Sequence, residues 1–142
     1  MALPADIAER LARMPQPPCA KTLGLEITAF DAERREAVAI AAGRSEFCNP
    51  MGMIQGGFLC AMLDDVMAVA AVFSSGFQSV VPTLEIKVSF YEPARPGPIN
   101  AVGRVAKMGK TIAFLEGELF APDGALLAKA SATARLAPVP GR

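Results

Sequence analysis

The sequence predicts an α+β protein in which one antiparallel sheet curls around one long helix. One stretch of the chain, 57–73, is apolar on almost every side of a helix, so it must be surrounded rather than laid on a surface. Most of the remaining structured stretches alternate apolar and polar residues with the period of a strand. The connections between these stretches are short. A sheet wrapped around the helix is the simplest arrangement that buries both.

The chain before the long helix is expected to hold a short helix, two strands and a loop. Prolines at 15, 17 and 18 end the first amphipathic segment. Apolar and polar residues then alternate in two short runs, with a charged turn between them. The expected elements are a helix at 4–13, strands at 23–27 and 37–41 with a turn at 31–35, and a loop at 43–53.

Four strands are expected after the long helix, which Ser74, Ser75 and Gly76 bring to an end. The Pro-Asp-Gly sequence at 122–124 predicts a hairpin between the last two strands. With 142 residues the chain fits one domain. The expected strands are 84–90, 99–107, 112–120 and 128–136; the expected organisation is an N-terminal helix and proline-rich lead-in at 1–20, one domain at 21–137 and a loose tail at 138–142.

The composition excludes several classes of function. Lysine plus arginine equals aspartate plus glutamate, with 14 of each, so nothing favours binding to nucleic acid or to an acidic membrane. Two central aspartates would cost roughly 2.5–3.5 kcal/mol each in a bilayer, so the long helix is not expected to span a membrane. The three scattered cysteines, Cys19, Cys48 and Cys60, form no disulfide framework, and a reduced cytoplasmic protein is expected.

The chain contains no histidine. This excludes Ser-His-Asp and Cys-His catalytic pairs and every histidine-ligated metal. The Gly-Arg-Val-Ala-Lys-Met-Gly-Lys-Thr stretch at 103–111 has one residue too many between its glycines for a phosphate-binding loop, and a strand rather than a helix follows it. We therefore expect no metal and no cofactor, and a carboxylate as the general base of any reaction.

Two adjacent aspartates interrupt the long apolar helix, where a carboxylate costs free energy unless it is paired or used. The neighbours of Asp64 one and two turns away are nearly all small, which allows another group to approach closely. Asp65 points about 100° away from Asp64, so the two are not expected to act as a pair. From the residues alone, either carboxylate is as well explained by backbone amides or an ion pair as by catalysis.

The helix begins with Gln55, Gly56 and Gly57. Unpaired backbone amides at a helix N-terminus, with the positive end of the helix dipole, can stabilise a developing oxyanion. Gly57 and Asp64 are separated by about 10.5 Å along the axis. Asp64 is therefore expected to act with the helix start of a neighbouring subunit. The alternative, that the glycines only allow a tight start to the helix, stays open.

These residues resemble a known family. The stretch that carries the resemblance is N-P-M-G-M-I-Q-G-G at 49–57, followed seven residues later by Asp64. It is similar to the Asn-x-x-Gly-x-x-His-Gly-Gly pattern and following Asp of the hotdog-fold acyl-CoA thioesterases, in the phenylacetate-degradation (PaaI-like) branch. The segments at 81–97 and 107–120 resemble the same family, so the resemblance covers about 20–136. It implies a hotdog fold and a homodimer or homotetramer with its active sites at the subunit interface.

The resemblance also implies roles for individual residues. Asp64 would be the general base or nucleophile, supplied by the facing subunit. Asn49 would hold the nucleophilic water or the thioester, and the Gly56 amide would polarise the thioester carbonyl. Thr83 stands where the family has a serine or threonine that assists the water. The usual histidine of the family is Gln55 here, whose amide can donate a hydrogen bond but cannot carry a proton.

Further residues correspond to segments that contact the substrate. The cations among them, Arg95, Lys107 and Lys110, would meet the phosphates of coenzyme A. An apolar or aryl acyl group would fit among Met51, Met53, Phe58 and Met62, although these residues equally fit an ordinary core. The full set of expected substrate-binding residues is Gly57, Tyr91, Arg95, Lys107, Gly109, Lys110 and Thr111.

The function that follows is hydrolysis of an acyl-CoA thioester to a free acid and coenzyme A, the latter being part of the substrate rather than a cofactor. The alternative is a non-catalytic acyl-CoA binding or sensor protein on the same fold, for which Gln55 leaves room. A hotdog hydratase is disfavoured because that chemistry typically needs an Asp/His pair. A purely structural dimer would leave the buried aspartates and the paired glycines unexplained.

Overall fold

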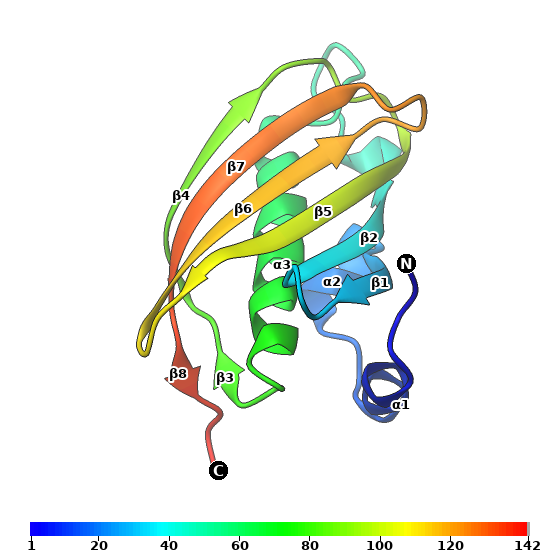
Figure 1. Ribbon diagram of the computed structural model, residues 1–142. Coiled ribbons are helices and arrows are strands. Elements are labelled where there is room, and N and C mark those ends of the chain that lie inside the picture. Colours follow the sequence, from blue (N-terminus) through cyan, green and yellow to red (C-terminus); the bar gives the residue numbers. More distant parts are fainter. Residues whose placement is uncertain (142) are drawn as a thin grey trace.

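The computed structural model describes residues 1–141. Two short helices and two strands precede the long helix, and the remaining strands follow it (Figure 1). In chain order the elements are α1 (Ala5–Arg13), α2 (Pro18–Leu23), β1 (Glu26–Asp31), β2 (Glu36–Gly43), a 3₁₀ turn (Ser45–Phe47), α3 (Gly56–Ser74), β3 (Ser79–Val80), β4 (Thr83–Phe90), β5 (Gly97–Met108), β6 (Ile112–Phe120), β7 (Leu126–Arg135) and β8 (Ala137–Pro138).

Six of the strands form one antiparallel sheet in the order β1-β2-β5-β6-β7-β4. The sheet curls around α3, as the sequence predicts, and leaves β4 as one of its two edges (Figure 1). The hairpin between β6 and β7 turns at the expected Pro-Asp-Gly, where Gly124 takes a φ of 91° and its N–H donates to the Ala121 carbonyl. The stretch at 103–111 belongs to β5 and to the β5–β6 hairpin, and a strand follows it. It therefore does not form a phosphate-binding loop, as the sequence predicts.

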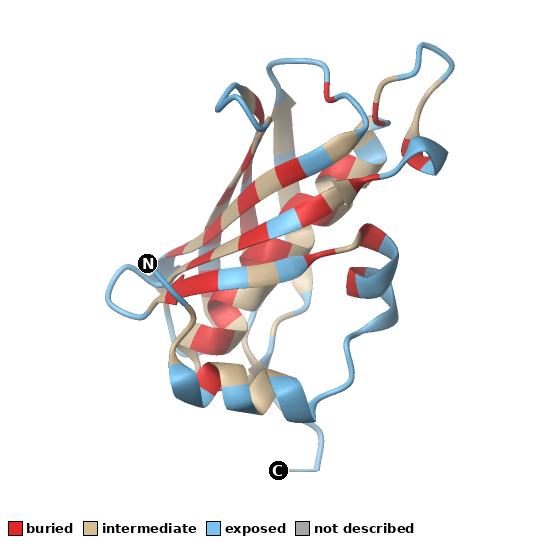
Figure 2. Cartoon of the chain, turned by 90° about the vertical axis from the view of Figure 1, so that its right-hand side faces the viewer, coloured by how far each residue is buried: buried red, intermediate tan, exposed pale blue. Residues whose placement is uncertain are grey.

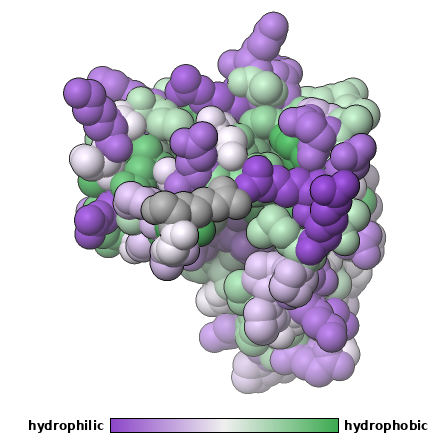
Figure 3. Space-filling model, turned by 90° about the horizontal axis from the view of Figure 1, so that it is seen from below, coloured by the Kyte–Doolittle hydropathy of each residue, from purple (hydrophilic) through white to green (hydrophobic). Residues whose placement is uncertain are grey.

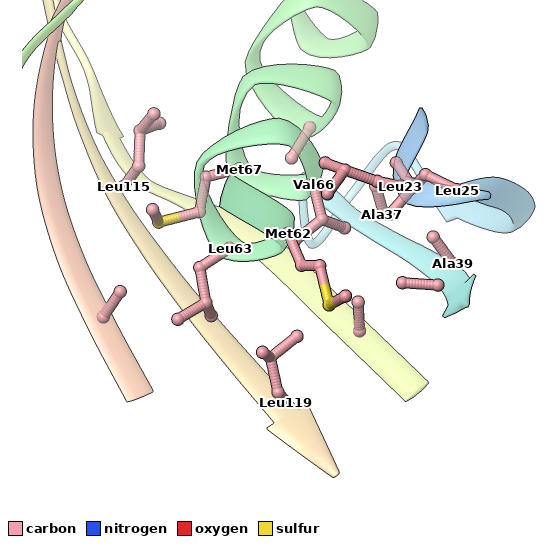
Figure 4. Packing of buried hydrophobic residues seen from close by; sticks show 14 of the residues in the cluster. Leu23, Leu25, Ala37, Ala39, Met62, Leu63, Val66, Met67, Leu115 and Leu119 are labelled. Atoms are coloured by element: carbon pink, nitrogen blue, oxygen red, sulfur yellow. The ribbon is translucent and has the colours of Figure 1, made fainter. Parts of the chain in front are cut away.

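The core lies between α3 and the concave face of the sheet. Buried residues alternate along the strands and cover much of α3 (Figure 2). Met62, Leu63, Val66 and Met67 of the helix are fully buried and face Leu115, Leu119 and small residues of the strands (Figure 4). Helix and sheet approach closely at Gly103 of β5, where an added Cβ would lie 2.3 Å from the Val66 carbonyl oxygen. A hydrogen atom at this position lets the two backbones touch.

The long helix is the core helix of the fold. By length and composition α3 is apolar enough to cross a membrane, but the sheet surrounds it (Figure 1). It begins one residue earlier than expected, with Gln55 as its N-cap. It ends at Ser74, followed by two residues with positive φ, Gly76 and Phe77. The Phe77 ring continues the aromatic contacts of the helix, with its centroid 5.0 Å from that of Phe73.

The expected strand at 23–27 is wrong in its first part, because Leu23 ends a helix that the sequence did not predict. Pro18 stands at the start of α2, where its missing N–H costs nothing, so the prolines begin a helix as well as ending one. Gly24 caps α2 in the left-handed conformation with a φ of 58°. The strand therefore begins at Glu26, and α2 crosses the expected boundary between 20 and 21.

The end of the chain is better anchored than a tail that is loose from residue 138. β8 pairs with β3 in a small two-stranded sheet beyond the end of α3 (Figure 1). The N–H of Val139 then donates to the Gln78 carbonyl at 3.2 Å. The C-terminal strand thus ties the segment after α3 to the end of β7.

Candidate active site

Asp64 and Thr83 lie together, although 19 positions separate them in the sequence. Asp64 is at the middle of α3, and Thr83 is the first residue of β4, which runs back along the helix. The Thr83 hydroxyl donates a hydrogen bond of 2.6 Å to Asp64 Oδ1. Because one oxygen of the carboxylate is held in this way, its orientation is set by the edge strand and does not depend on the helix alone.

A groove opens at this pair. It has a volume of about 460 Å³, and Asp64, Asp65 and Thr83 line it together with residues of α2 and of the segment before β4. Cys19 and Leu23 belong to the α2 wall, which the sequence did not predict. Cys60 lies one turn before Asp64, and burial, reinforced by the negative charge of Asp64, raises the pKa of its thiol. The groove thus presents a carboxylate and a hydroxyl in largely apolar surroundings.

Asp65 is in a different position from Asp64, as the helical geometry predicts. Its Oδ2 is sealed from solvent and has no hydrogen-bond partner within residues 1–141. Such an unpaired buried group costs about 1–3 kcal/mol. Burial raises the pKa of the Asp65 carboxyl, and the adjacent negative charge of Asp64 raises it further. The neutral acid is therefore favoured more strongly at Asp65 than in an unfolded chain.

The start of α3 is open at the residues expected to form an oxyanion site. Gln55 is the N-cap but its side chain makes no capping hydrogen bond among the described residues. A Cβ added to Gly57 would meet nothing within 4 Å in the described chain, so this turn faces open space. A Cβ on Gly56 would lie 3.1 Å from the ring of Phe90, at the end of β4. The sequence did not single out Phe90, which its alternating strand pattern hides among apolar residues.

Asn49 shapes the loop before α3. Its side-chain oxygen accepts hydrogen bonds from the N–H groups of Met51, at 2.9 Å, and Met53, at 3.2 Å. Two backbone donors at one amide atom identify that atom as the oxygen. The Asn49 N–H also donates to the Met53 carbonyl at 2.7 Å, and the loop turns at Gly52 with a φ of 78°. The amide NH₂ of Asn49 is the part of the side chain left for contact with a substrate.

The remaining predicted residues fall at two ends of the sheet. Tyr91 and Arg95 follow β4 at the upper end in Figure 1, near the start of α3; Tyr91 is 57% exposed, and Arg95 lines a groove of about 400 Å³. Lys107, Gly109, Lys110 and Thr111 lie at the β5–β6 hairpin, at the lower end. The Leu136 N–H donates to the Thr111 carbonyl at 2.8 Å, which ties this hairpin to the end of β7.

Two groups of predicted site residues therefore exist in one chain. The first lies at the upper end of β4 and contains Asn49, Gln55, Gly56, Gly57, Tyr91 and Arg95. The second lies at the lower end and contains Asp64, Thr83, Lys107, Gly109, Lys110 and Thr111. β4 is eight residues long, which corresponds to about 25 Å. One chain does not bring the two groups together.

The residues expected to line an acyl pocket do not form one. Met62 is fully buried inside the core, and Met51 is 80% exposed. Phe58 instead stacks on Phe47, with ring centroids 4.2 Å apart. The sequence could not separate these positions because methionine is common both in cores and in ligand pockets. Among residues 1–141, no group of three or more His, Cys, Asp or Glu side chains is arranged to hold a metal ion.

Comparison with known proteins identifies the family of the chain. Residues 51–128 match the family model described as the thioesterase superfamily. A protein of Saccharolobus solfataricus whose name proposes an esterase is 31% identical over 106 residues, which cover 75% of each chain. A crystal structure from Ralstonia eutropha JMP134, described as a proposed thioesterase related to phenylacetic acid degradation, is 36% identical with a TM-score of 0.84, and the match covers 89% of this chain and 97% of that one.

A third relative shows the fold alone. The PaaI protein from the phenylacetic acid degradation operon of E. coli is 20% identical, with a TM-score of 0.79 over 92% of this chain and 90% of that chain. Both solved structures match nearly the whole of the curled sheet and its helix, which confirms the predicted arrangement.

Proposed function

Because the chain belongs to the thioesterase superfamily and has the hotdog fold of its PaaI-like members, we propose that it hydrolyses an acyl-CoA thioester to a free acid and coenzyme A. The observation that carries the proposal is the hydrogen bond of 2.6 Å from Thr83 to Asp64. It orients a carboxylate on an apolar helix towards an open groove. The absence of histidine makes a carboxylate the appropriate general base.

In the proposed reaction, Asp64 accepts a proton from a water molecule while the water oxygen attacks the carbonyl carbon of the thioester. The negative charge that develops on the carbonyl oxygen is stabilised by the backbone N–H of Gly56 and the side-chain amide of Gln55. When the tetrahedral intermediate collapses, the carbon–sulfur bond breaks and the proton held by Asp64 passes to the departing thiolate. The free NH₂ group of Asn49 donates a hydrogen bond that holds the water or the thioester in position.

We infer that a second copy of the chain completes the site. β4 is an edge strand, and an edge strand with exposed apolar side chains is a template for pairing with another chain. If two β4 strands pair antiparallel about a twofold axis, the Thr83 end of one meets the Phe90 end of the other. The Asp64 of one subunit then serves the Gly56 of its partner. Leu84 and Phe90 of β4, which are 60% and 52% exposed, would be covered in such a homodimer. Phe114 of β6, which is 49% exposed, lies two strands away from this edge and is available for a further contact in a homotetramer.

The same pairing would assemble the contacts to coenzyme A. Arg95 at one end and the Lys107 and Lys110 side chains at the other supply the cations for its phosphates. Tyr91 and the hairpin residues Gly109 and Thr111 complete the expected surface, with Gly57 leaving room beside the helix start.

One observation favours a second candidate, an acyl-CoA binding or sensor protein without hydrolysis. Gln55 replaces the histidine that the family pattern has at the start of the helix, and its side chain is not committed to capping the helix. Such a protein would bind acyl-CoA at the same groove and leave the thioester intact.

The test is a screen of the wild-type protein against acetyl-, octanoyl- and phenylacetyl-CoA, followed by Asp64→Asn. Loss of a general base is expected to lower kcat by about 10²- to 10⁴-fold. Asp31→Asn, at the β1–β2 turn, is the matched control and should keep the wild-type rate, because the Asp31 carboxylate accepts hydrogen bonds only from the N–H groups of that turn. Turnover by Asp64→Asn at the wild-type rate would remove Asp64 from the mechanism. Tight binding with no hydrolysis by the wild type would favour the sensor instead.

A further inference from the structure

A second cavity, open to solvent on one side, lies away from the start of α3. It has a volume of about 390 Å³ and lies between α3, β1 and the N-terminal segment. Its walls are mainly apolar, with Leu11, Met14, Ile27, Val69 and Val72 among them. We call it the inner chamber. Figure 3 views the lower end of the molecule, where apolar surface lies between polar side chains.

α1 is held in place as one wall of the inner chamber. The Arg10 guanidinium lies 4.4 Å from the centroid of the Phe77 ring, and the Phe30 N–H donates to the Ala2 carbonyl at 3.3 Å. The linker after α1 is also fixed, because the Gln16 side-chain amide donates to the Leu25 carbonyl at 3.0 Å. The N-terminal wall of the chamber is therefore fixed by contacts of this chain, while exposed residues such as Met14 and Glu26 mark its open side.

The inner chamber adjoins the groove of Asp64. Asp65 and Ala68 line both cavities, so one side of α3 separates them and no second layer of structure intervenes. A ligand that occupied both cavities would pass over Ala68. The carbonyl carbon of a thioester could thus stay beside Asp64 while the rest of the acyl group lies among apolar side chains.

Asp65 is the polar feature at this boundary. Of the other polar side chains on the chamber wall, Gln16 is engaged with the Leu25 carbonyl and Glu26 is exposed. The Asp65 carboxyl has an oxygen with no partner within residues 1–141. A buried group of this kind favours a ligand that supplies the missing hydrogen bond over one that does not.

We propose that the inner chamber binds the acyl group of the substrate, and that Asp65 selects acyl groups that carry a hydroxyl close to the thioester. The inference rests on the proposed function, because the acyl group reaches the chamber only when the thioester is bound in the groove beside Asp64. The substrate class is a medium-length acyl chain with a hydroxyl near its third carbon, since Asp65 is adjacent to Asp64 in the helix. The volume suits such a chain, because a cavity of about 150 Å³ already holds benzene.

Binding of thioether analogues of coenzyme A tests this without any hydrolysis. The full-length wild-type protein is titrated calorimetrically with S-ethyl-, S-octyl- and S-(3-hydroxyoctyl)-CoA. Each methylene that enters the chamber is worth about a fourfold gain in affinity, so S-octyl-CoA should bind at least tenfold more tightly than S-ethyl-CoA. The hydroxyl should add about a further fivefold. Equal affinities for the ethyl and octyl compounds would overturn the proposal that the chamber binds the acyl group, and this comparison needs no variant.

Variants identify the residues responsible. Val72→Phe fills the chamber and should reduce the octyl-to-ethyl affinity ratio at least tenfold, whereas Val102→Phe, a matched substitution on the outer face of the sheet, should leave the ratio unchanged. Asp65→Leu should make the hydroxyl unfavourable, and Asp65→Asn, which keeps hydrogen-bonding atoms, should retain part of the preference. A hydroxyl preference that persists in Asp65→Leu would overturn the role of Asp65.

The two proposals fail differently. A wild-type protein that binds S-octyl-CoA tightly but hydrolyses no thioester would contradict the proposed function and leave the chamber intact. A protein that hydrolyses acetyl- and octanoyl-CoA but binds the ethyl and octyl analogues equally would contradict the chamber and leave the hydrolysis intact.

Discussion

Gly103→Ala is expected to be strongly destabilising, because the added methyl group would clash with the backbone of α3. The new Cβ would lie 2.3 Å from the Val66 carbonyl oxygen, 2.6 Å from its carbon and 2.8 Å from the Met67 nitrogen. These are backbone atoms of α3, which cannot rotate away as a side chain does. The helix would have to move about 1 Å from the sheet to restore normal contact, which opens gaps around fully buried side chains.

The size of the loss in stability follows from the kind of atom that the new methyl group would clash with. Overpacking a well-packed core costs about 1–3 kcal/mol, and occasionally more, so Gly103→Ala should lower the free energy of unfolding by about 3 kcal/mol. Gly117→Ala is the matched control on the next strand, β6. Its Cβ would meet the side chains of Met67 and Leu63 at 3.0 and 3.1 Å. Those flexible ends can shift, and replacing glycine gains back about 0.4–1 kcal/mol from the unfolded chain, so Gly117→Ala should be nearly neutral.

Urea unfolding followed by far-UV circular dichroism measures both variants at one protein concentration. We expect the free energies of unfolding of the two variants to differ by about 2 kcal/mol or more. Because Val66 lies two residues from Asp64, Gly103→Ala should also reduce turnover even where the protein is folded. Equal stabilities of the two alanine variants would refute the close contact between helix and sheet.

Three further predictions concern the site and the interface. Burial and Asp64 raise the pKa of Asp65 in the folded protein, so its contribution to stability is lost as the pH rises through that raised pKa. Asp65→Asn should therefore increase the melting temperature at pH 8, and the gain should shrink as the pH falls towards the ordinary value of 3.8; a gain that is constant with pH would contradict this. Leu84→Arg on the β4 edge should give a monomer in analytical ultracentrifugation with little activity, and an active monomer would argue against a shared site. Thr83→Val should lower kcat about tenfold by removing a hydrogen bond to a charged group, and Thr83→Ser should restore it; equal rates for the two variants would exclude an orienting hydroxyl.

Much of the fold was predictable because its signals are local. The alternation of apolar residues places β4 to β7 within a few residues of their bounds, and the Pro-Asp-Gly turn fixes one hairpin. The all-round apolar helix required a sheet to surround it. α2 was missed because its six residues carry no periodic pattern and its prolines indicate a break. β3 and β8 were missed because two-residue strands depend on tertiary contact.

The candidate site was predictable in part. The sequence singled out Asp64 and Thr83, and the structure brings them within hydrogen-bond distance. It did not reveal that Phe90 covers Gly56, or that α2 lines the groove of Asp64. Of the residues considered for an acyl pocket, Met62 belongs to the core, the alternative that the sequence left open, because residue type does not tell a core methionine from an exposed one.

Composition and helical periodicity are properties of the chain alone, and they are enough to predict the fold class, to exclude histidine chemistry and to point Asp64 and Asp65 in different directions. What each aspartate faces depends instead on the packing of distant segments. Curling of the sheet carries Thr83 of the edge strand to Asp64, while the packing of α1 and β1 against α3 forms the walls of the chamber beside Asp65. These contacts join segments far apart in the chain, and their distances depend on how closely helix and sheet approach at Gly103.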